Sequence, residues 1–132
     1  MNGTVREWID KAEGDYRTAH REFQAPEAPN YDAVCFHAQQ AVEKLMKAVL
    51  IHHAVVPPRI HNLERLHELL LEACPTVALD VEGLRLLTNA GMATRYPGEE
   101  ADRDDAAQAL AMCERVRHEL LGLFQKTNEE RA

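Results

Sequence analysis

The stretch Phe36-His37-Ala38-Gln39-Gln40-Ala41-Val42-Glu43-Lys44-Leu45-Met46-Lys47-Ala48 decides the fold, because it places a polar row on an otherwise strongly apolar helix. At about 100° per residue, one side of that helix carries a core stripe: Val34, Ala38, Ala41, Leu45, Ala48 and Val49, flanked by Cys35, Val42 and Met46. The opposite arc carries Phe36 together with Gln39, Gln40, Glu43, Lys44 and Lys47. An aromatic ring among polar groups predicts a surface that meets a partner.

Local signals divide the whole chain into five helical segments, and none shows the alternation of a strand. Caps, prolines and apolar spacing place these segments at about Thr4 to Gln24, Asn30 to His53, Asn62 to Cys74, Asp80 to Gly91 and Glu99 to Gln125. Thr4 is expected to cap the first, and the carboxylates from Glu99 onward suit the start of the last. We predict a single all-α domain over residues 1–132, an up-and-down four-helix bundle with one additional short helix.

Composition excludes several classes of protein. Of the 132 residues, 45% are hydrophobic and 28% are charged, which indicates a globular chain with a real core. No apolar run approaches the roughly 20 residues that span a bilayer, the N-terminus lacks the apolar centre of a signal peptide, and the three cysteines are unpaired by spacing. A cytoplasmic protein is expected. The net charge of −7 argues against strong nucleic-acid binding.

The pattern F-x-x-Q-Q-A-x-E-K-x-x-K-A resembles the HEPN family (higher eukaryotes and prokaryotes nucleotide-binding). Further matches follow in order along the chain: Asp15 with Ala19, Pro58 with His61-x-Leu63-x-x-Leu66, and Arg95-Tyr96-Pro97. The resemblance implies a small helical domain, often encoded beside a minimal nucleotidyltransferase. It also implies a choice among several functions, because this fold hosts ribonucleases, toxins, ligand binders and inert partners.

The ribonuclease branch of that family works with an Arg-x(4–6)-His motif, whose cation and imidazole stabilise phosphate charge and move a proton. No histidine of this chain has an arginine five to seven residues upstream, and the nearest approach is Arg59, eight residues before His67. The absence predicts no catalytic residues and no ribonuclease activity. A catalytic pair assembled across a dimer from distant positions stays open as an alternative.

The seven histidines invite a test for a metal site. Glu64 and His67 have the Glu-x-x-His spacing of helical di-iron bundles, but such sites need two copies of it. Only one copy occurs, and there is no H-E-x-x-H motif. We therefore expect no metal and no cofactor, with Glu64 and His67 as a solvent-facing pair.

Five residues are candidates for a ligand site: Lys44, Lys47, His61, Arg95 and Tyr96. A guanidinium offers two hydrogen bonds to phosphate, a phenol offers a face for a base, and the lysines would add charge if all border one groove. In the structural alternative, Arg95 pairs with Glu43 or another carboxylate and Tyr96 plugs the end of the bundle. For His61, the alternative to ligand contact is capping of free backbone groups in its turn.

A homodimer is expected through the face formed by Phe36, Gln40, Glu43 and Lys47. The sequence as a whole predicts a non-catalytic HEPN-type domain that acts as a dimeric nucleotide-binding or partner module, paired with a minimal nucleotidyltransferase in a toxin-antitoxin-like system. The first alternative is a divergent HEPN ribonuclease or toxin. The second is a purely structural adaptor without a small ligand.

Overall fold

The computed structural model describes the backbone of residues 3–93 and 95–131, with side chains to Gln125, and its regular elements are all helices. They are α1 (Gly3–Phe23), α2 (Tyr31–His52), α3 (Leu63–Ala73), α4 (Val81–Met92) and α5 (Arg103–Arg131). Among the described residues there is no strand, which confirms the all-α prediction. No helix in this part of the chain is both long and apolar enough to cross a membrane.

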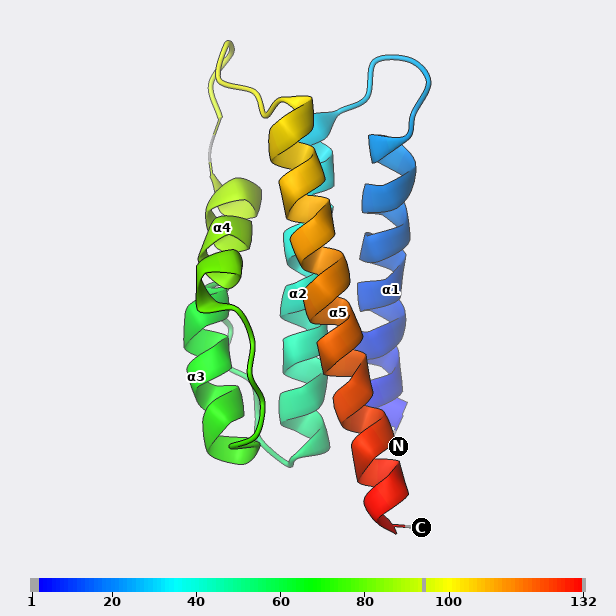
Figure 1. Ribbon diagram of the computed structural model, residues 1–132, viewed down its shortest axis with the longest axis vertical. Helices are drawn as coiled ribbons and strands as arrows, with labels where there is room; N and C mark the ends of the chain where they lie inside the picture. The colour runs from blue at the N-terminus through cyan, green and yellow to red at the C-terminus, as the bar shows by residue number, and fades with distance from the viewer. Residues whose placement is uncertain (1–2, 94, 132) are drawn as a thin grey trace.

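Three long helices and one pair of short helices form the bundle (Figure 1). The short helices α3 and α4 follow one another along one flank of α2, so together they take the place of a fourth long helix. Helix α2 packs against each of the other four helices. It is therefore the central element, as its long apolar stripe predicts.

The stripe of α2 is buried throughout. Val34, Ala38, Ala41, Leu45, Ala48 and Val49 are at most 1% exposed, and the flanking Cys35, Val42 and Met46 are fully buried. Removing such apolar side chains from water is the main contribution to folding, at roughly 25 cal/mol per Å². Burial also raises the pKa of the Cys113 thiol to about 12, which leaves that cysteine a small inert hydrophobe.

Three helix starts follow the predicted caps, because an unpaired backbone N–H at a helix start needs an acceptor. The side chains of Asn30, Asn62 and Asp80 accept hydrogen bonds from the backbone N–H three residues later, at 3.0, 3.2 and 3.1 Å. The predicted cap at Thr4 is wrong, since α1 already begins at Gly3.

The predicted start of the last helix is also wrong by four residues, because α5 begins at Arg103 rather than at Glu99. Glu99 belongs to a turn in which its N–H donates to the carbonyl of Tyr96 at 2.9 Å. Asp102 then caps α5: its Oδ1 accepts from the N–H of Asp105 at 2.8 Å, while its own N–H donates to Asp105 Oδ2 at 3.0 Å. These two reciprocal hydrogen bonds fix the helix start more strongly than the general attraction of carboxylates such as Glu99 to the positive end of the helix dipole.

Candidate functional site

The polar row of α2 is largely inside the molecule. Gln39, Glu43 and Lys47 are only 0, 4 and 7% exposed, so the prediction of an exposed polar row is wrong for these three. The apolar stripe alone cannot reveal this burial, because a second set of helices, α3 and α4, packs on that flank of α2. Buried charges must then be paired, since an unpaired charge away from water is very costly.

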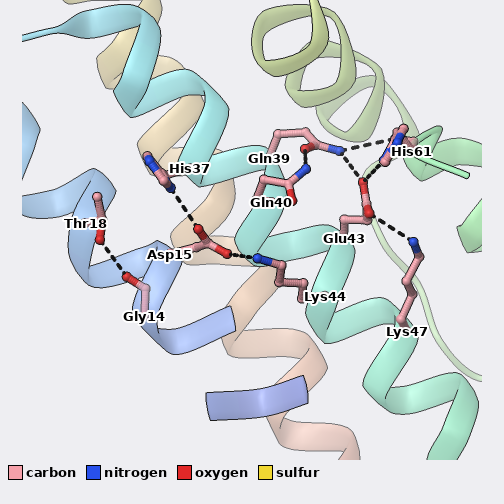
Figure 2. A network of polar contacts seen from close by, with 10 residues as sticks. All are labelled: Gly14, Asp15, Thr18, His37, Gln39, Gln40, Glu43, Lys44, Lys47 and His61. Carbon is pink, nitrogen blue, oxygen red and sulfur yellow. Dashed lines mark hydrogen bonds and ion pairs between the residues drawn. The ribbon is translucent and has the colours of Figure 1, made fainter. Parts of the chain in front are cut away.

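Glu43 is the centre of the buried network (Figure 2). Its Oε1 lies 3.0 Å from both Gln39 Nε2 and His61 Nδ1, and its Oε2 accepts from Lys47 Nζ at 3.0 Å. Burial by itself would raise the pKa of Glu43, but the hydrogen bonds from Gln39, Lys47 and His61 outweigh it and hold the pKa below its ordinary value. The carboxylate is thus a structural hub, ionised and fully occupied.

His61 joins the connector before α3 to this hub. The Gln39 side chain also donates to the His61 carbonyl at 3.2 Å, so two contacts hold the residue against α2. Capping of α3 is done by Asn62, and the acceptor beside the His61 ring is Glu43 rather than the backbone. Its side chain remains 65% exposed, which leaves the other edge of the ring in solvent.

A second network joins α1 to α2 through Asp15 (Figure 2). Its Oδ1 lies 2.8 Å from His37 Nδ1, and its Oδ2 accepts from Lys44 Nζ at 2.5 Å. The sequence prediction left out His37. The seven-residue spacing of His37 and Lys44 was the available signal. Residues seven apart lie two turns apart on one helix face, so their side chains can reach the same carboxylate.

Arg95 is held at the far end of the bundle by the first turn of α2. Its Nε lies 3.1 Å from Asp32 Oδ1, and its two terminal nitrogens donate to the carbonyls of Ala90 at 3.1 Å and Glu99 at 3.4 Å. The partner carboxylate is therefore Asp32 and not Glu43. Tyr96 is 66% exposed, so its ring does not plug the bundle end.

The five predicted ligand residues do not border one groove. Lys44 pairs with α1, whereas Lys47 and His61 meet at Glu43. Arg95 contacts Asp32, which lies fifteen residues before Lys47 and so about 22 Å away along the axis of α2. Each of the three cations already has its own carboxylate.

The four residues of the predicted dimer face differ in their accessibility. Phe36 is 42% exposed and Gln40 is half-buried, while Glu43 and Lys47 are buried within the protomer. Only the first two side chains can reach a second copy directly.

Glu64 and His67 are not a pair. Glu64 accepts from Arg85 at 2.9 and 3.0 Å, whereas His67 is 6% exposed and its Nε2 has no hydrogen-bond partner. The prediction that His67 faces solvent is therefore wrong. Burial lowers the pKa of His67, because the charged imidazolium is disfavoured away from water. Within the described residues, no group of three or more His, Cys, Asp or Glu side chains could hold a metal ion.

Comparison with known proteins agrees with this architecture. The chain is similar to TT1696 from Thermus thermophilus, with 23% identity, a TM-score of 0.74, and coverage of 92% of this chain and 98% of that one. It is also similar to ST0689, an archaeal HEPN homologue, with 21% identity, a TM-score of 0.65, and coverage of 90% and 96%. At such identities these two structures support the fold alone. No curated protein matches the chain. The HEPN domain model matches residues 5–123, nearly the full length, and the chain therefore belongs to the HEPN family.

Proposed function

We propose that this HEPN domain is a non-catalytic partner module that works as a homodimer bound to a second protein. One observation carries the proposal: the three cations predicted from the sequence to bind phosphate, Lys44, Lys47 and Arg95, are each neutralised by their own carboxylate, while the aromatic rings of Phe36 and Tyr96 are exposed. Exposed aromatic side chains are enriched at protein interfaces. The family resemblance implies that the second protein is a minimal nucleotidyltransferase.

Two measurements test this proposal. A tagged copy of the chain should retain the product of an adjacent nucleotidyltransferase gene through purification, and light scattering of the chain alone should give the mass of a dimer. A specific dimer of this kind buries at least about 1,000 Å² in total. A monomer at high micromolar concentration that retains no second protein would contradict the proposal.

The sequence predicted either a partner module or a nucleotide-binding module. Nucleotide binding through Arg95 requires its guanidinium to break the ion pair with Asp32. Calorimetry with ATP, GTP and their diphosphates distinguishes the two modules. If Arg95 contacts a phosphate, Arg95→Ala should weaken binding by about tenfold or more, since hydrogen bonds to charged groups contribute about 1.5–3 kcal/mol. Binding no tighter than millimolar, or binding unaffected by Arg95→Ala, supports the partner module instead.

A divergent ribonuclease is the second candidate, and one feature favours it. His37 and Arg21 line one open hollow of about 470 Å³ between α1 and α2. Asp15 holds His37 through Nδ1, so Nε2 is the nitrogen that could move a proton, and the guanidinium could offset phosphate charge. Cleavage of an unstructured RNA that disappears in the His37→Ala protein would establish this function. The partner module predicts no cleavage by either protein.

A further inference from the structure

Two shallow hollows lie side by side at the C-terminal end of α4, and both are lined by Ala90, Ala93 and Arg95. The first, of about 260 Å³, extends to Phe36 and Asp32 on α2. The second, of about 400 Å³, extends to Asp105 on α5. We call the two hollows together the α4-end groove. It runs from the first turns of α2 across α4 to the first turn of α5.

Apolar side chains that the protomer does not cover lie at the rim of the α4-end groove, beside the polar groups of Asp32 and Arg95 in the hollow that Phe36 borders. The Phe36 ring on its rim is 42% exposed, Ala93 is exposed, and Tyr96, next to the groove residue Arg95, is 66% exposed. Two aromatic rings left in water at one end of a small domain are available for burial against another chain. A groove of this size accommodates a few side chains of a partner segment rather than an entire interface.

Charge decides which kind of segment fits. Arg95 is the one cation among the lining residues, and Asp32 neutralises it at 3.1 Å. Asp105 also lines the groove, and the segment from Glu99 to Asp104 adds four more carboxylates against the single cation of Arg103. The negative dipole end of α4 is offset by the positive N-terminal ends of α2 and α5, so the charge balance of the groove rests on the carboxylates. The surroundings are therefore acidic, which opposes phosphate ligands and favours cations.

We infer that the α4-end groove docks a segment of a partner protein that presents lysine or arginine beside an apolar side chain. The apolar side chain would pack on Phe36 and Ala93, and the cation would meet Asp105. A second copy of this chain is disfavoured in this groove, because a symmetric interface through it would bring two identical acidic surfaces together. The homodimer of the proposed function would then form through a surface other than this groove. The inference deepens the proposed partner function by naming its surface and the chemistry of its ligand.

The groove can be tested with two short synthetic peptides that share their leucines, one carrying lysine and arginine and the other glutamate. Backbone amide shifts of the isotopically labelled full chain report where each peptide binds. The expected result is that the cationic peptide perturbs residues around Phe36, Ala93 and Asp105, that added salt weakens this binding, and that the acidic peptide has no effect. Perturbation elsewhere, no perturbation, or equal effects of both peptides would overturn the inference.

Matched variants separate this inference from the partner function itself. Phe36→Ser should weaken cationic-peptide binding by about tenfold or more. Asp105→Asn, which keeps an acceptor for the Asp102 N–H, should weaken it by about two- to fivefold. Leu71→Ser and Glu72→Gln change an exposed leucine and an exposed carboxylate on α3, and should leave binding unchanged.

The same four variants are then assayed for retention of the partner protein and for mass. If the partner is retained by every variant, the partner function stands and the groove assignment is wrong. If Phe36→Ser converts a dimer to a monomer, the groove belongs to the second copy and the inference is overturned. Circular dichroism confirms that each variant is folded.

Discussion

Glu43 and Asp32 lie on the same helix, about three turns apart, and each carboxylate holds a cation. Glu43 holds Lys47 of the same helix, whereas Asp32 holds Arg95 from the loop after α4. Glu43 is buried with three side-chain partners, whereas the Asp32 side chain is 36% exposed and binds Arg95 in a loop. A carboxylate–cation pair therefore has a different role in each region. Where α3 and α4 enclose it, the pair fixes how the helices pack, and at the open end of the bundle it positions a surface loop.

The sharpest test of this comparison is to remove the buried carboxylate. Glu43→Leu should lower the free energy of unfolding by about 3–5 kcal/mol, because Lys47 is left buried without a counter-charge. Urea denaturation followed by circular dichroism measures the loss. The double variant with Lys47→Leu should recover most of it, and a double variant as unstable as the single one would show that the pair is not the cause.

The two regions meet at Gly91, which lines the α4-end groove and packs on the Gln39 side of α2. A Cβ at this position would lie 2.4 Å from Gln39 Cβ and 3.0 Å from the Cys35 carbonyl oxygen. Gly91→Ala should therefore lower the free energy of unfolding by about 1–3 kcal/mol. Gly122→Ala on α5 is the control, because nothing lies within 4 Å of its added Cβ. Equal stability of the two variants would contradict this close approach of α4 and α2.

The buried region should also be the acid-sensitive one. The pKa of His67 is lowered by burial, so as the pH falls below the ordinary value of 6.5 the unfolded chain takes up the proton first and stability decreases. The pKa of Glu43 is lowered as well, so its contribution is lost as the pH falls from its ordinary value of 4.5 through the lower folded value. Denaturation at a series of pH values should show both windows, and His67→Leu should abolish only the upper one.

The smallest effect is expected at the exposed end. Arg95→Ala removes a partly exposed ion pair and should lower the free energy of unfolding by no more than about 1 kcal/mol. Thermal denaturation beside Glu43→Leu gives the contrast directly. A loss as large as that of Glu43→Leu would mean that Asp32 and Arg95 are as integral to the fold as the buried network.

Local signals in the sequence were sufficient to predict where most of the helices begin and which residues of α2 form its apolar stripe. The caps Asn30, Asn62 and Asp80 act within three residues of the backbone groups that they bind, and the α2 stripe follows from helical periodicity alone. The Glu99 error arose within the same short range, because a turn and the Asp102–Asp105 pair competed for the helix start.

The site depended on which elements pack beside α2, and no local pattern specifies that. Periodicity assigns Gln39, Glu43 and Lys47 to the polar side of a helix, but α3 and α4 cover that side and turn an expected surface into a buried network. The same tertiary arrangement pairs Arg95 with Asp32, sixty-three residues earlier in the chain. The sequence by itself determined where helices form, because backbone capping and periodicity are local. Only the tertiary structure decided which charges are paired and that the Tyr96 ring stays exposed, because both depend on contacts between distant segments.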